Sequence, residues 1–130
     1  MKYEFAPDIQ EIVEEIVRTL NLNHVKTDSV QCFRSIGTNS RNIIARCHGL
    51  GKVMQKALDR KGFYVLEFLT ERFDRQSEEE QIKTIIHEIM HIPKSFGGGF
   101  KHHNFVTEKN VNTLYQEFML RKESKPNFFC

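Results

Sequence analysis

The residues from His87 to His91 read H-E-x-x-H, a spacing that places two metal ligands on one face of a helix. Residues i and i+4 of an α-helix lie one turn apart on the same side, so the imidazoles of His87 and His91 can reach one metal ion. Glu88 lies about 100° further round the helix, where its carboxylate can act on a water molecule at the metal. Zn²⁺ lowers the pKa of such a water to about 7, and a neighbouring carboxylate can take its proton. The motif therefore indicates a metal-dependent hydrolase.

A shuffled chain of this composition would contain H-E-x-x-H roughly 0.03 times, so the motif is uncommon by chance. Alone it is only suggestive, and the surrounding sequence must also be compatible with a metal site. A predicted helix provides that context. Ser77 and Glu80 form an S-x-x-E capping box at which a helix can begin, and Pro93 with the glycines at 97–99 can end it. Between these signals runs an apolar stripe at helical spacing: Ile82, Ile85, Ile86 and Ile89. The alternative is an ordinary amphipathic helix that carries two solvated histidines.

A catalytic zinc site has three protein ligands, and the third must come from another part of the chain. His102 and His103 follow residues 93–100, a segment with one proline and three consecutive glycines. Glycine accepts positive φ, so this segment can turn the chain back over the end of the helix. Spacing alone leaves His102 and His103 equally open as the third ligand, and either can instead be a solvated loop residue.

Length and composition indicate a soluble globular chain. With 130 residues, 39% hydrophobic and 28% charged, the sequence predicts one domain over residues 1–122 and a C-terminal tail over 123–130. The role of Phe128, Phe129 and Cys130 in that tail is left open. The sequence has no apolar run long enough to span a membrane and no apolar segment at the N-terminus, which predicts a cytoplasmic protein.

Charge and cysteine content restrict the partners and the chemistry. A formal net charge of +2, without a dense basic block, gives no indication of nucleic-acid binding. None of the three cysteines belongs to a C-x-x-C pair, so free thiols are expected. Cys32 and Cys47 are expected in the core, and Cys130 is expected at the surface. The lone histidines His24 and His48 are interpreted as structural or solvated residues.

The order of predicted elements gives an α+β fold, a small three-stranded sheet packed on helices. Apolar periodicity predicts helices over 8–20, 52–59, 77–91 and 107–121, and strands over 29–36, 42–48 and 63–69. The turn at 37–40 predicts that the first two strands form a hairpin. The H-E-x-x-H helix is expected to lie against the sheet, where an exposed edge strand could take an extended peptide by strand addition.

From about Ser40 to Tyr115 the chain resembles a family of small metallopeptidases of archaea and phages, related to the SprT-like (Spartan-type) zinc proteases. The matching stretches are residues 40–46 (SRNIIAR), 64–67 (YVLE), 87–93 (HEIMHIP) and 96–103 (FGGGFKHH). In the family pattern a histidine follows a hydrophobic-basic-x triplet. Residues 100–102 fit that triplet, so the resemblance implies that His103, rather than His102, is the third ligand.

The resemblance also implies a zincin-like fold with the H-E-x-x-H helix at its core, zinc as the cofactor, and a peptide or protein as the substrate. SprT-like proteases often carry an additional zinc or DNA-binding segment. This sequence contains no such segment, which argues against action on DNA. The resemblance to SprT-like proteases is the one observation that keeps a nucleic-acid partner open.

The sequence therefore predicts a zinc-dependent metallopeptidase in which His87, His91 and His103 bind the metal and Glu88 is the general base. Two alternatives stay open. A metal-dependent ribonuclease could use the same three histidines and would not require Glu88. A non-catalytic, zinc-stabilised protein-binding domain would hold the ion with four protein ligands, which could include both His102 and His103.

Overall fold

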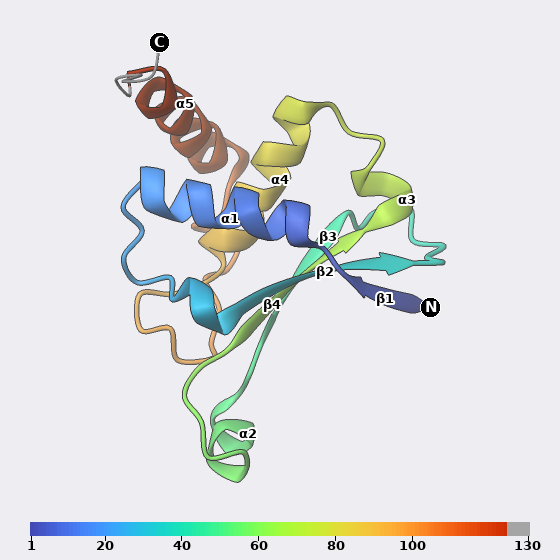
Figure 1. The fold of residues 1–130 in the computed structure, drawn as a ribbon, viewed down its shortest axis with the longest axis vertical. Coiled ribbons are helices and arrows are strands. Elements are labelled where there is room, and N and C mark those ends of the chain that lie inside the picture. The colour runs from blue at the N-terminus through green and yellow to red at the C-terminus, as the bar shows by residue number, and fades with distance from the viewer. Residues whose placement is uncertain (125–130) are drawn as a thin grey trace.

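The computed structural model describes residues 1–124, which form one mixed sheet with helices on one side of it. The strands are β1 (Lys2–Phe5), β2 (Val30–Ile36), β3 (Ala45–Gly49) and β4 (Tyr64–Leu69). The α-helices are α1 (Pro7–Thr19), α2 (Lys52–Ala57), α3 (Thr70–Phe73), α4 (Glu78–Met90) and α5 (Glu108–Ser124), and a short 3-10 helix, η1, spans Thr27–Ser29. Helices α1, α4 and α5 gather beside the sheet, and α2 lies at the far tip of β3 and β4 (Figure 1). The predicted α+β class is confirmed.

The strands lie in the order β1-β2-β4-β3, with β2 and β4 parallel and the other two pairs antiparallel. The predicted hairpin between β2 and β3 is wrong, because both strands pair with β4 instead. Strand β4 carries Tyr64, Leu66 and Phe68, all fully buried toward the helices, and its apolar character gives it a central position. The connection over residues 37–44 is too long for a tight two-residue hairpin.

The prediction of three strands is also wrong, because β1 adds a fourth. All four residues of β1 are exposed, and the strand pairs with the edge of β2. Tyr3 and Phe5 alternate with Lys2 and Glu4, which is the period of a strand. The stretch is too short for that alternation to stand out in the sequence.

The core forms where α1 and α4 pack on the sheet. Helix α1 buries Ile9, Val13 and Ile16, which lie on one face at the predicted spacing. Near the start of α1, the guanidinium of Arg34 on β2 binds the carboxylate of Asp8 with two hydrogen bonds of 2.7 and 2.9 Å. A third hydrogen bond, of 3.2 Å, joins it to Asp74 after α3. These contacts join the first turn of α1 and the residue after α3 to β2.

The predicted tail over 123–130 lies outside the described residues from residue 125 onward, and Cys130, Phe128 and Phe129 lie there too. Within residues 1–124, no helix is long and apolar enough to cross a membrane. The zincin-like arrangement and the single domain over 1–122 stay predictions.

Candidate metal centre

Helix α4 positions the first two histidines and the glutamate of the motif. Its first turn is capped as predicted: the backbone N–H of Glu80 donates to Oγ of Ser77 over 3.2 Å. The helix buries its isoleucine stripe against the core, so the opposite face, with His87, looks out of the core. His91 is the C-terminal cap residue of the helix. The two histidines therefore lie one turn apart at the end of a rigid, well-packed element.

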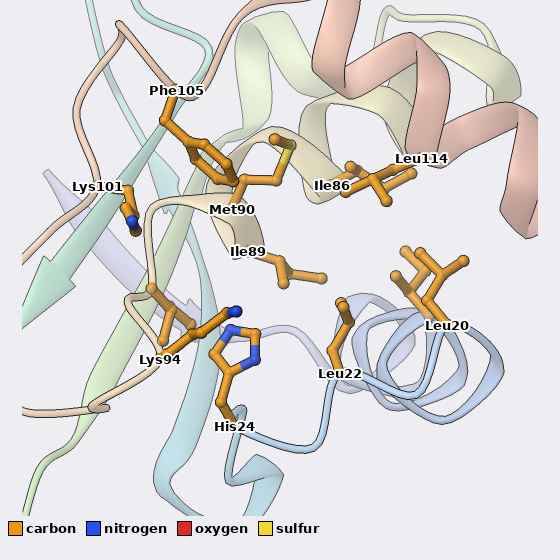
Figure 2. Close-up of a pocket in the computed structure, with 12 residues that line it drawn as sticks. Leu20, Leu22, His24, Ile86, Ile89, Met90, Lys94, Lys101, Phe105 and Leu114 are labelled. Carbon is orange, nitrogen blue, oxygen red and sulfur yellow. The ribbon is translucent and has the colours of Figure 1, made fainter.

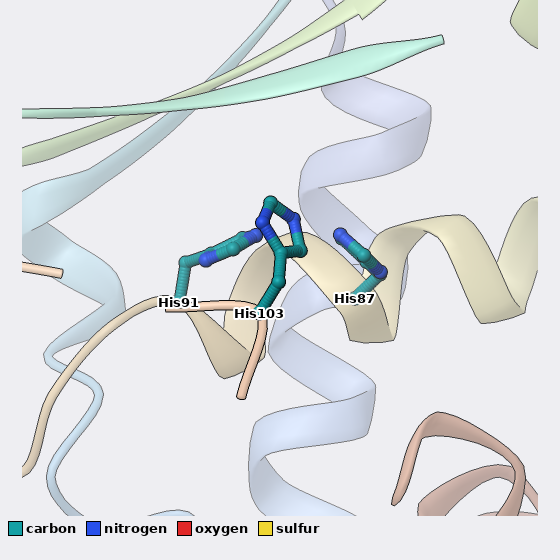
Figure 3. A group of neighbouring side chains, drawn as sticks. All are labelled: His87, His91 and His103. Carbon is teal, nitrogen blue, oxygen red and sulfur yellow. The ribbon is translucent and has the colours of Figure 1, made fainter. Parts of the chain in front are cut away.

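The structure brings the side chain of His103 to these two histidines. Each of the three offers a ring nitrogen, and the three nitrogens all lie within 4.8 Å of one another. Ring centroids are separated by 5.0 Å for His87 and His91, and by 5.5 and 4.9 Å from these rings to His103. Figure 3 shows the three imidazoles turned toward a common space beside α4. His102 and His103 are both exposed, but only His103 is part of this cluster.

Two hydrogen bonds to the segment after α4 orient His91. The backbone N–H of Lys101 donates to the carbonyl of His91 over 2.8 Å, and Nδ1 of His91 lies 2.6 Å from the carbonyl oxygen of Lys101. A carbonyl oxygen can only accept, so Nδ1 must carry the proton and Nε2 keeps its lone pair free. Metal-binding histidines are commonly oriented in this way, by a hydrogen bond from the ring nitrogen that does not bind the metal.

The chemistry of the three donors fits a metal ion. Burial, followed by the neighbouring rings of His91 and His103, lowers the pKa of His87 to about 4. Burial also lowers the pKa of His91. These two imidazoles are therefore neutral at pH 7, as metal binding requires. Zinc–nitrogen bonds of about 2.1 Å in a tetrahedron separate the nitrogens by about 3.4 Å, so small side-chain rotations would bring the three onto one ion.

Glu88 lies beside the cluster and is 6% exposed. Burial raises the pKa of its carboxyl group to about 7. Its Oε2 atom is 3.9 Å from Nε2 of His87, too far for a direct hydrogen bond. A carboxyl group with a pKa near neutrality can both take up and release a proton at physiological pH. The side chain is therefore suited to proton transfer next to the three histidines.

Two hollows meet at the cluster. One, of about 610 Å³, extends along α4 toward α5, and the other, of about 310 Å³, extends along β3 toward Phe100. Both are lined by His87, Glu88, His103 and Ala45. The histidines therefore lie in the middle of a cleft that is open in both directions, with β3 as one of its walls. An extended chain can cross the cluster in such a cleft.

A comparison with protein families agrees with this arrangement. The family described as "Putative phage metallopeptidase" matches residues 1–123. The chain belongs to this family. Membership in a metallopeptidase family implies a metal ion and a peptide or protein substrate. No curated protein and no solved structure matches the chain.

In this member of the family, residues that the sequence motif did not identify hold the glycine segment in place. The hydroxyl of Tyr64 on β4 donates to the carbonyl of Gly99 and accepts from the N–H of Gly98, both over 2.8 Å. The Gln55 amide on α2 donates to the carbonyl of Gly97 over 2.9 Å. These residues lie more than thirty positions from the segment, so no local pattern could have identified them.

Gly98 itself has no room for a side chain. Its φ is +99°, and a Cβ atom would lie 2.2 Å from the carbonyl oxygen of Leu50. A glycine is therefore required where the segment passes the tip of β3. The turn that the three glycines predicted is present, and it returns the chain toward the end of α4.

The remaining histidines and cysteines have other environments. Nε2 of His48 lies 2.7 Å from Glu67, a structural contact on the sheet face that α1 and α4 do not cover. His24 borders a separate cavity. Cys32 is fully buried, and Cys47 is half-buried in a wall of the cleft. Burial raises the pKa of both thiols to about 12, so neither is a thiolate at neutral pH.

Loss of the Tyr64 hydroxyl should loosen the glycine segment. We expect Tyr64→Phe to lower the free energy of unfolding by about 1–2 kcal/mol, because a buried hydroxyl loses two hydrogen bonds to the backbone. Hydrogen exchange at the Gly98 amide should become faster. Denaturant unfolding and exchange measurements would check this, with Tyr3→Phe, an exposed tyrosine on β1, as the matched control. Equal stability and exchange in both variants would contradict the predicted role.

Burial of Glu88 should make the metal-free protein less stable at high pH. Its folded-state pKa of about 7 lies above its ordinary value of 4.5. Between these two pH values the unfolded state loses the proton first, so the stability that Glu88 contributes is present below pH 4.5 and lost as the pH rises through 7. We therefore expect Glu88→Gln to stabilise the chelator-treated protein at pH 8, by up to about 3 kcal/mol, and to have little effect at pH 4.

Comparing the two proteins at each pH cancels the contribution of His87, which titrates in both. The exposed residue Glu79 supplies the control substitution, Glu79→Gln. A stability difference between wild type and Glu88→Gln that does not change with pH would show that the carboxyl group of Glu88 is not buried as described.

Proposed function

We propose that this protein is a zinc-dependent peptidase that hydrolyses peptide bonds in the cleft between β3 and α4. The observation that carries the proposal is the convergence of three histidines beside a buried glutamate, in a chain that belongs to a metallopeptidase family. His87, His91 and His103 are the proposed metal ligands. Three imidazole nitrogens are a common ligand set for zinc and leave a fourth position free for catalysis.

A structural zinc site has four protein ligands, whereas a catalytic site has three and leaves the fourth coordination position for water or substrate. Among the described residues, no other histidine, cysteine or acidic side chain joins the three histidines. His102 lines the adjacent hollow, but its ring nitrogens are not among the clustered donors. This arrangement favours an enzyme over a domain in which zinc has only a structural role.

Glu88 is the proposed general base. A bound zinc ion would act as a Lewis acid that acidifies a water molecule and polarises the carbonyl of the scissile bond. The Glu88 carboxylate takes one proton from the attacking water as the new carbon–oxygen bond forms. It then gives that proton to the amide nitrogen as the carbon–nitrogen bond breaks, so that the amine leaves neutral. In the metal-free protein, burial raises the pKa of this carboxyl group to about 7.

Strand β3 is the proposed binding platform for the substrate. It lies at an edge of the sheet, pairs only with β4 among the described strands, and forms a wall of the cleft. An extended peptide that adds to this edge would run past Ala45 and bring a backbone carbonyl to the histidines. Main-chain pairing would give affinity without a strong side-chain preference.

Metal content tests the ligand set. We expect about one zinc per chain in the wild type after zinc is supplied, and a large loss of zinc in His103→Ala, because two imidazoles alone bind zinc weakly. His102→Ala is the matched control and should keep its zinc. Elemental analysis after dialysis measures both. Loss of zinc in His102→Ala, with retention in His103→Ala, would reverse the proposed assignment.

Peptide cleavage tests the role of Glu88. We expect Glu88→Gln to keep the metal and to lose at least about 100-fold in rate, because an amide cannot take the proton from water. Cleavage of an unfolded protein such as casein, followed by mass spectrometry, would measure this. An unchanged rate in Glu88→Gln would exclude the proposed mechanism. RNA cleavage that survives the substitution would favour a metal-dependent ribonuclease instead.

A further inference from the structure

A second cavity, of about 230 Å³, lies between α1, α4, α5 and the segment after α4. Nine of its twelve lining residues are apolar. The other three are His24, Lys94 and Lys101, and none of the twelve is acidic. The cavity borders a different face of α4 from the histidine cluster: it is lined by Ile86, Ile89 and Met90. An interior that is apolar, with basic groups alone as its charged members, indicates a ligand with an apolar body and a negative charge.

The charged and apolar groups are separated within the cavity. Figure 2 shows Lys94, Lys101 and His24 toward one side, and Leu20 and Leu114 toward the other. Lys94 is close enough to His24 to lower the pKa of its imidazole, although burial is the larger cause. A ligand that matches this distribution has its charge at one end and its hydrocarbon at the other.

The two lysines are available for a ligand. Both are exposed, and neither forms an ion pair with a residue in the described part of the chain. The ammonium group of Lys101 lies 5.0 Å from the centre of the Phe105 ring, at the edge of the cavity. An anion at this position would meet positive charge without displacing an existing acidic partner.

We infer that this cavity binds a small carboxylate with an unbranched hydrocarbon tail, of the medium-chain fatty acid class. Its volume is below the usual range for ligand pockets, about 300–1,000 Å³, which excludes a bulky ligand. The apolar walls disfavour inorganic phosphate or a sugar phosphate, because most of their polar surface would lose its hydration. A neutral hydrocarbon would leave the lysines without a function, and a cation would be repelled by them.

The cavity lies on another face of α4 from the proposed peptidase centre, and its basic groups, Lys94, Lys101 and His24, are not members of the histidine cluster. The two sites share Lys101, which also lines the hollow beside the histidines and binds His91 through its backbone. Failure of the peptidase proposal would leave this one standing, and the reverse also holds. A carboxylate can itself bind a metal ion, however, so binding must be measured both in the protein as purified and after removal of metal by a chelator.

The methionine methyl groups provide a direct measurement. Met90 lines the cavity, and Met54 lies exposed on α2, at the far tip of the sheet. In protein labelled with ¹³C at its methionine methyls, titration with octanoate should shift the Met90 signal saturably and leave the Met54 signal in place. Octan-1-ol, with the same tail and no charge, should bind more weakly, and octylamine more weakly still.

Substitutions at the two ends of the cavity separate charge from shape. The double variant Lys94→Gln/Lys101→Gln should bind octanoate about tenfold more weakly and octan-1-ol unchanged, since each exposed ion pair contributes roughly a factor of three. Lys109→Gln, on the exposed side of α5, is the matched control and should bind like wild type. Leu114→Phe should fill part of the cavity and weaken binding of both ligands.

Several outcomes would overturn the inference. One is the absence of a saturable Met90 shift at millimolar octanoate. A second is equal binding of octanoate and octan-1-ol with no effect of the lysine substitutions. That result would show that the cavity binds hydrocarbon and does not recognise the carboxylate. A third is binding that disappears with the chelator, which would place the carboxylate on the metal. Preferential binding of a short peptide with a C-terminal leucine would assign the site to a peptide terminus instead.

Discussion

The contact between His91 and Lys101 is the constraint on which the arrangement of the site depends. Helix α4 ends at Met90, and Lys101, ten residues after His91, returns to form two hydrogen bonds with His91. One of these bonds fixes the tautomer of the imidazole. Both place the chain so that His103, two residues further on, reaches the ring nitrogens on α4. One local pairing thus determines the direction of one imidazole and the position of another.

The site buries Glu88 and partly buries His87, two ionisable groups whose charged forms are more stable in water. Burial disfavours the charged form of both Glu88 and His87, so it raises the pKa of the first to about 7 and lowers that of the second to about 4. Buried ionisable groups of this kind lower the stability of a domain whose net stability is only about 5–15 kcal/mol. The isoleucines of α4 and the apolar face of α1 offset that cost by packing on β4. The rigid core is what permits a polar, partly desolvated centre at the end of α4.

Much of the fold could be predicted because its signals are local. The periodicity of α1, the capping box at Ser77 and the breaking residues after α4 each act within a few positions along the chain. The order of the strands in the sheet could not be predicted in this way, because it depends on comparing the apolar character of all the strands. The sequence signal of the turn at 37–40 favoured a hairpin, yet β2 and β3 both gain more by pairing with β4, whose residues are nearly all buried.

The candidate site divides in the same way. His87, Glu88 and His91 lie within about one turn of α4, so their spacing in the sequence was enough to predict that they are neighbours. The choice between His102 and His103 required knowledge of how the chain returns, and that return depends on Tyr64 and Gln55, which are distant in sequence. A sequence motif can therefore identify donors that share an element. It cannot orient a donor whose position is set by side chains elsewhere in the fold.

Helix α4 serves two surfaces at once. One face carries the histidine pair, and a neighbouring face lines the apolar cavity through Ile86, Ile89 and Met90. The segment from 92 to 106 also borders both, because it carries His103 and contributes Lys94 and Lys101 to the cavity. Lys101 contacts His91 through its backbone and the cavity through its side chain. Lys101 is therefore the one lining residue that the cavity and the hollow beside the histidines have in common.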